Sequence, residues 1–177
     1  MPKRDLQDVL EIAPQSRPSC DTATDLHSSW ALASQGKWTD AIDAYSAVLR
    51  SSANSADTRA ALASALAAAG RTADAIAQWT EAVRLRPDRA DLHAALGFAL
   101  AGQGNTPDAI AHFSEAVRLQ PGSEQAHLYL GIALAATGRG VEGAAHLNEA
   151  LRINPNNDAA RRALESIKQS VAKRSSR

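Results

Sequence analysis

One phrase of this sequence recurs at a fixed interval, and the interval constrains the fold more than any other feature. The segment AIAQWTEAVRLRP covers residues 75–87, and the similar segment AIAHFSEAVRLQP covers 109–121. Their starts differ by 109 − 75 = 34 residues, and a third copy, AAHLNEALRINP, ends 34 residues after the second, at Pro155. A period of about 20–50 residues is typical of stacked supersecondary units rather than of one globular core. We therefore expect a solenoid.

The same step keeps its register through four copies, 22–55, 56–89, 90–123 and 124–157. It aligns a glycine column (Gly36, Gly70, Gly104, Gly138), a large apolar column (Tyr45, Trp79, Phe113, Leu147) and a small column (Val48, Ala82, Ala116, Ala150). Apolar residues recur at helical spacing on both sides of each glycine, so each copy predicts two helices. The glycine is expected to end the first helix in the left-handed conformation.

Several columns together carry a family resemblance. The second copy has Leu62, Ala63, Leu66, Gly70, Ala75, Trp79, Ala82 and Pro87, and the third repeats them as Leu96, Gly97, Leu100, Gly104, Ala109, Phe113, Ala116 and Pro121. Between about Thr22 and Asn157 the chain resembles the tetratricopeptide repeat. The resemblance implies an all-α fold, a right-handed α-solenoid of about four helix-turn-helix repeats. The fourth copy departs from the pattern at Gly143, which predicts a second helix that is loosened near its start.

The two ends of the chain lie outside the repeats. Residues 158–172 have an apolar stripe opposite charged residues, which predicts a helix that caps the last repeat, followed by a tail at 173–177. In the N-terminal segment, 1–21, Leu6, Val9 and Leu10 form a short apolar stripe. This segment can cap the first repeat, occupy a groove in its own chain or in a second copy, or be disordered. If the segment occupies the groove of a second copy, the chain self-associates through this stripe, and this is one hypothesis.

Charge and composition exclude several classes of partner. The chain has 19 basic and 19 acidic residues, whereas proteins that bind nucleic acids generally carry surplus cations, so we expect no nucleic-acid partner. No apolar run approaches the roughly 18 residues of a spanning helix, so no membrane insertion is expected. The N-terminus does not read as a signal peptide, so the expected location is cytoplasmic. The single cysteine, Cys20, is interpreted as incidental.

The polar residues that recur in phase indicate structure rather than catalysis. Glu81, Glu115 and Glu149 each lie three residues before Arg84, Arg118 and Arg152, a spacing that supports exposed helices. The pairs His93/His127 and His112/His146 are each in phase, which suggests histidine ladders, with His93 and His127 partly buried at the repeat interface. Equivalent positions lie too far apart to share a metal ion. We expect no catalytic site, no cofactor and no metal.

The resemblance also implies where a partner would bind, because the first helices of such repeats line the concave surface. Chaperone-binding members of the family grip a carboxylate there with lysine, asparagine and arginine, but here Ala60 and Ala95 stand instead and Asp91 has the opposite charge. The predicted groove residues are Leu26, Trp30, Ser64, Asp91, Phe98, Gln125, Leu128, Tyr129 and Ile132. Trp38 and Trp79 are assigned to packing.

These observations predict a non-catalytic interaction module or adaptor. Its groove would take an apolar or amphipathic peptide or helix of another protein, because Trp30, Phe98, Tyr129 and Ile132 place bulky apolar groups around small ones. One alternative is that these residues serve packing alone. Another is a self-assembling scaffold that oligomerises through the N-terminal helix or the repeat ends, which would make the partner a second copy of the chain.

Overall fold

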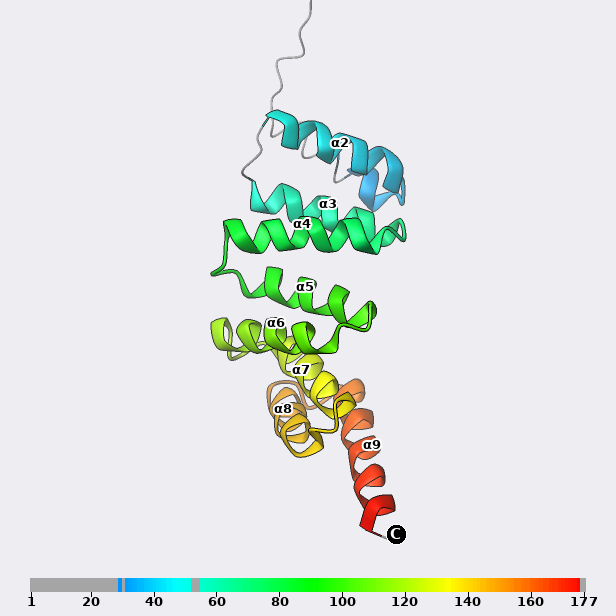
Figure 1. The fold of residues 1–177 in the computed structure, drawn as a ribbon, viewed down its shortest axis with the longest axis vertical. Helices are drawn as coiled ribbons and strands as arrows, with labels where there is room; N and C mark the ends of the chain where they lie inside the picture. The colour runs from blue at the N-terminus through cyan, green and yellow to red at the C-terminus, as the bar shows by residue number, and fades with distance from the viewer. Residues whose placement is uncertain (1–28, 30, 52–54, 176–177) are drawn as a thin grey trace, which may run out of the picture.

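The computed structural model describes residues 29, 31–51 and 55–175, and of residues 171–175 it describes the backbone only. Figure 1 shows the helices stacked in chain order along the long axis of the molecule. They are α2 (Trp38–Ser51), α3 (Ala56–Ala68), α4 (Thr72–Leu85), α5 (Ala90–Gly102), α6 (Thr106–Leu119), α7 (Glu124–Ala136), α8 (Gly140–Ile153) and α9 (Asp158–Ser175). Every regular element in this described part is a helix, so the predicted all-α solenoid is confirmed.

Tight turns join α3 to α4, α5 to α6 and α7 to α8. At each of these turns, and before α2, the glycine column adopts a positive φ, at Gly36 (73°), Gly70 (79°), Gly104 (82°) and Gly138 (84°). After Gly104 the chain closes back on α5, because the Asn105 N–H donates to the Leu100 carbonyl at 3.0 Å. A β-carbon is disfavoured in this left-handed conformation, which explains why glycine recurs here.

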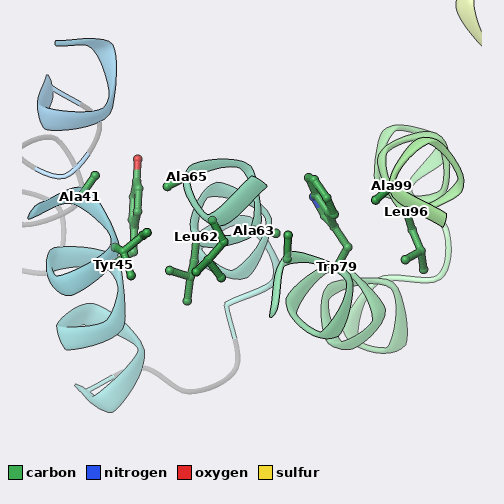
Figure 2. Close-up of a cluster of buried hydrophobic side chains, with 11 residues drawn as sticks. Ala41, Tyr45, Leu62, Ala63, Ala65, Trp79, Leu96 and Ala99 are labelled. Carbon is green, nitrogen blue, oxygen red and sulfur yellow. The ribbon is translucent and has the colours of Figure 1, made fainter. Parts of the chain in front are cut away.

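The core lies between successive helices and is formed by the in-phase columns. Tyr45, Phe113 and Leu147 of the large column are buried, and so are Ala82 and Ala116 of the small column. Figure 2 shows Trp79 of α4 lying between Ala63 of α3 and Ala99 of α5. Because every copy places a large residue against small ones from its neighbours, the interfaces repeat as the sequence repeats.

The prediction for Gly143 was wrong. Helix α8 is regular from Gly140 onward, and the Gly143 N–H donates to the Arg139 carbonyl at 2.9 Å. Gly143 is buried, and a β-carbon on it would lie 2.6 Å from the carbonyl oxygen of Gly131 in α7. A second close approach occurs at Gly131 itself, where a β-carbon would lie 2.7 Å from Leu147 Cγ. The glycine therefore lets α7 and α8 pack closely instead of loosening α8.

Helix α9 covers the last repeat. Ala160 is buried with Leu147 and Ala150, and Leu164 and Ile167 pack on the same cluster. Asn157 caps the helix, because its Oδ1 accepts from the Ala160 N–H at 2.8 Å. The helix ends at Ser175 rather than at the expected residue 172, so the predicted tail at 173–177 is wrong in its first residues.

Candidate functional site

A hollow of about 360 Å³ lies between α5 and α7, which are the first helices of the third and fourth repeats; we call the first helix of a repeat its inner helix and the second its outer helix. Its lining residues are Trp79, Asp91, Ala94, Ala95, Phe98, Gln125 and Tyr129. Four of the predicted groove residues, Asp91, Phe98, Gln125 and Tyr129, are thus brought together from two repeats. Ala94 and Ala95 have short side chains, so they leave the hollow open to solvent. We call these seven residues the α5–α7 hollow.

Aromatic side chains dominate the α5–α7 hollow. The Phe98 and Tyr129 ring centroids are 5.3 Å apart with a tilt of 46°, and Tyr129 also lies 5.5 Å from the ring of Phe113. Tyr129 therefore connects the surface to the core, because Phe113 is buried while Phe98 is 58% exposed. Gln125 Nε2 donates to the Tyr129 hydroxyl at 3.2 Å. Such tilted aromatic pairs hold their geometry at low entropic cost.

Trp79 is the lining residue that the sequence did not predict for the site. It belongs to the in-phase large column and is 7% exposed, so its assignment to packing is correct. It also lines the α5–α7 hollow from α4, the outer helix of the preceding repeat. This second role could not be predicted from the sequence, because membership of a repeating column indicates burial but does not indicate which edge of a side chain remains exposed.

An ion-pair network borders the α5–α7 hollow at the start of α5. Arg89 donates to Asp91 Oδ1 and Oδ2 at 2.7 and 2.6 Å, and to Asp57 Oδ1 at 2.9 Å. The hydrogen bonds from Arg89 lower the pKa of the Asp91 carboxyl below its ordinary value. The hydrogen bonds to Asp91 and then to Asp57 raise the pKa of the Arg89 guanidinium. One cation thus faces two carboxylates, which leaves one net negative charge at the rim.

Arg89 breaks the pattern of its own column. The equivalent positions, 34 residues apart, are Ser55, Ser123 and Asn157. Ser55 and Ser123 cap α3 and α7, accepting from Thr58 N–H and Ala126 N–H at 3.1 and 3.3 Å. The Arg89 side chain gives α5 no such cap. A comparison of the cap positions in the sequence would have singled out Arg89, because it is the copy in which the capping side chain is replaced.

The other predicted groove residues lie elsewhere. Leu128 packs on the cluster of Leu147, Ala150 and Ala160, so it belongs to the interface with α9 and not to the hollow. Ile132 is 41% exposed on α7, in phase with Phe98, and Ser64 of α3 donates to the Ala60 carbonyl at 2.9 Å. The predicted residues Leu26 and Trp30, and the stripe of Leu6, Val9 and Leu10, lie outside the described residues.

Two histidine pairs sit inside the third and fourth repeats. His93 Nδ1 lies 3.1 Å from His112 Nδ1, and His93 Nε2 lies 3.2 Å from the Pro87 carbonyl. A carbonyl only accepts, so His93 carries its proton on Nε2 and His112 donates from Nδ1. His127 and His146 repeat this arrangement, also at 3.1 Å.

The expected in-phase ladders are therefore wrong, because each contact joins the two helices of one repeat. His93 and His127 are each 7% exposed, as expected for histidines at the repeat interface. Burial, and then the neighbouring His93 and His127, lower the pKa values of His112 and His146 respectively. No group of three His, Cys, Asp or Glu residues within the described ranges could hold a metal ion.

The glutamate–arginine pairs are confirmed as exposed helix support. Arg118 donates to Glu115 at 2.6 Å and Arg152 to Glu149 at 2.7 Å, and Arg84 makes the same contact with Glu81. Each arginine is mostly solvent-exposed, so these pairs contribute little to stability. Across the helices that the structure describes, none is both long and apolar enough to cross a membrane.

Comparison with known proteins places the fold. The family model described as Tetratricopeptide repeat matches residues 26–90, 60–124 and 95–158. Similar solved structures include the MamA protein, with 21% identity and a TM-score of 0.81 over 88% of this chain and 85% of that one. YrrB, described as a TPR protein with an unusual peptide-binding site, has 19% identity and a TM-score of 0.74 over 82% and 75% of the two chains.

A third similar structure is the first TPR of Spaghetti (RPAP3) bound to the HSP90 peptide SRMEEVD. It has 22% identity and a TM-score of 0.65, and the match covers 66% of this chain and 93% of that one. A search of curated protein sequences gives no match. Because the three overlapping matches of the family model together span residues 26–158 and the stacked helix pairs agree with them, this chain belongs to the tetratricopeptide repeat family.

Proposed function

We propose that this protein is a non-catalytic adaptor that binds an apolar or amphipathic segment of another protein in the α5–α7 hollow. The observation that carries the proposal is Phe98, a large apolar side chain that is 58% exposed beside a hollow of about 360 Å³. Removing apolar surface from water is favourable, so a partner that covers the exposed Phe98 side chain gains binding free energy.

The surroundings of Phe98 favour a helix or a short peptide as the partner. Ile132 is exposed at the equivalent position of the next inner helix, and Ala94 and Ala95 leave room beside Phe98. An amphipathic helix presents apolar residues at three- and four-residue spacing, which suits a shallow groove with separated apolar contacts. YrrB is described as having an unusual peptide-binding site and the first TPR of Spaghetti as bound to a peptide, and both share this fold, which supports a peptide as the partner.

Site-specific photo-crosslinking tests the proposal. Benzoylphenylalanine replaces Phe98 in one variant and Val141 in another, because Val141 is 86% exposed but lies in the first turn of α8, outside the α5–α7 hollow. We expect adducts with segments of other proteins at position 98 and none at 141. Equal labelling at both positions, or no adduct at 98, would contradict the proposal.

The same experiment addresses the self-assembly alternative. An adduct at position 98 between two copies of this chain, abolished when residues 1–20 are deleted, would favour a scaffold that oligomerises through the stripe of Leu6, Val9 and Leu10. Those residues lie outside the described ranges, so self-association stays a prediction from the sequence. The cytoplasmic location likewise stays a prediction.

A further inference from the structure

We propose that the α5–α7 hollow recognises a basic side chain, arginine before lysine, placed next to an apolar residue of the bound segment. This inference rests on the proposed function and adds the chemistry of the ligand. It is carried by three features of the described residues: an aromatic lining, an acidic rim, and an arginine whose position in the repeat is occupied by capping side chains elsewhere.

The lining supplies aromatic surface for a cation. Phe98, Tyr129 and Trp79 all line the α5–α7 hollow, and Phe98 and Tyr129 lie 5.3 Å apart. The negative potential of an aromatic face attracts a guanidinium or ammonium group within about 6 Å of the ring centroid. A guanidinium also stacks on aromatic rings through its own flat surface, which an ammonium cannot do. The lining therefore favours arginine over lysine.

The rim supplies a carboxylate for the same cation. Asp91 lines the hollow and its side chain is 62% exposed, so its carboxylate has lone pairs open to a ligand after it has bound Arg89. Asp57, 70% exposed, is held by the same guanidinium. No lysine or arginine is among the described residues that line the hollow. Asp57, Arg89 and Asp91 together carry one net negative charge, so the rim attracts a basic ligand and repels an acidic one.

Arg89 orients this rim. Serine or asparagine at this position caps α3, α7 and α9, whereas Arg89 gives α5 no side-chain cap and instead bonds both oxygens of Asp91. The lack of a capping side chain leaves α5 less stabilised at its start than α3 or α7, so the replacement is not neutral for α5. Because Arg89 bonds both oxygens, the Asp91 carboxylate is held in one orientation beside the aromatic rings, and its remaining lone pairs can accept from a ligand guanidinium.

A selection experiment on the full chain tests the inference. A phage-displayed library of random peptides is selected on the wild-type protein and on three variants, Asp91→Asn, Phe98→Ala and Asp88→Asn. Asp88 is the matched control, because it is an exposed aspartate paired with an arginine two residues earlier, Arg86, and does not line the hollow. Leading peptides are then synthesised with arginine, glutamine or glutamate at the basic position and titrated by fluorescence anisotropy.

We expect the recovered peptides to combine apolar residues with arginine. Replacing that arginine by glutamine, or Asp91 by asparagine, should each weaken binding about five-fold, and the two changes together should add little, because they remove one interaction. Asp88→Asn should leave the affinity unchanged. Near 1 M salt, where the screening length is about 3 Å, wild type and Asp91→Asn should bind more alike.

Two other outcomes separate the inference from the proposed function. Peptides whose binding needs Phe98 but which show no basic preference and bind Asp91→Asn as tightly as wild type would overturn the inference and leave the adaptor proposal intact. A selection that yields no peptide whose binding depends on Phe98 would overturn both. Circular dichroism of each variant verifies that helicity is retained, so that a loss of binding reports the surface.

Discussion

The packed faces between the helices and the α5–α7 hollow follow opposite rules. In the packed faces, residues 34 positions apart are alike, as with the buried Ala82, Ala116 and Ala150. Two large residues of the hollow break this recurrence: Phe98 corresponds to Ser64 and Ile132, and Tyr129 corresponds to Ala95. Among these apolar positions, recurrence accompanies burial and its interruption accompanies exposed surface, whereas the exposed glutamate–arginine pairs recur as helix support.

The largest expected effect lies in the packed faces. Phe113→Ala should lower the free energy of unfolding by about 3–5 kcal/mol, because it removes a buried aromatic side chain between α5, α6 and α7. Phe98→Ala, which truncates an exposed ring of the same type, should cost less than about 1 kcal/mol. Urea unfolding followed by circular dichroism measures both. Equal losses in the two variants would break the distinction between the two regions.

A second prediction concerns the close approach of α7 and α8. Gly143→Ala should lower the free energy of unfolding by about 1–3 kcal/mol, because its β-carbon would lie 2.6 Å from the Gly131 carbonyl oxygen. Gly102→Ala is the matched control, since it is also helical but has no neighbour within 4 Å of the added carbon. This control should be neutral or stabilise by up to about 1 kcal/mol. A neutral Gly143→Ala would show that α8 moves away without penalty.

A third, smaller effect depends on pH. Burial and then the partner His93 lower the pKa of His112 below its ordinary 6.5, against the opposing Asp108, and burial and His127 do the same for His146 against Glu142. The unfolded chain therefore binds more protons just below pH 6.5, so stability is present above that pH and is lost as pH falls through the lowered pKa values.

The pH effect is tested with a double variant, His112→Gln and His146→Gln. The urea midpoint of the wild type should fall between about pH 7.5 and about pH 5.5, and that of the double variant should fall less. Binding to the hollow should change less than stability does over the same range, because the pKa of Asp91 is held low by Arg89. Identical pH profiles for both proteins would mean that these pairs do not set the acid sensitivity.

The sequence predicted the solenoid because each copy repeats the same physical constraints. The glycine column required left-handed turns, and Gly36, Gly70, Gly104 and Gly138 adopt them. Single positions within one copy were harder to predict. The Gly143 prediction was wrong because a missing β-carbon was interpreted as lower helix propensity, whereas its effect here is on helix–helix distance.

The candidate site could be predicted only in part. Phe98 and Tyr129 interrupt the pattern and meet in the hollow, while Leu128 turns toward α9, since its direction depends on how the capping helix packs. The histidine contacts were missed because they join residues 19 positions apart, which no comparison at the 34-residue step can bring together. Such contacts depend on the relative rotation of two helices.

We propose that Phe98 anchors a partner in the hollow while contributing little to the stability of the solenoid. The most direct test measures peptide affinity and urea midpoint together for Phe98→Ala and Val141→Ala, two exposed apolar residues truncated in the same way. We expect Phe98→Ala to weaken binding of the selected peptide at least ten-fold at an almost unchanged urea midpoint, as for an anchor worth about 1.4 kcal/mol or more. Val141→Ala should change neither quantity. Unchanged affinity in Phe98→Ala, or a loss of affinity matched by a loss of stability, would contradict it.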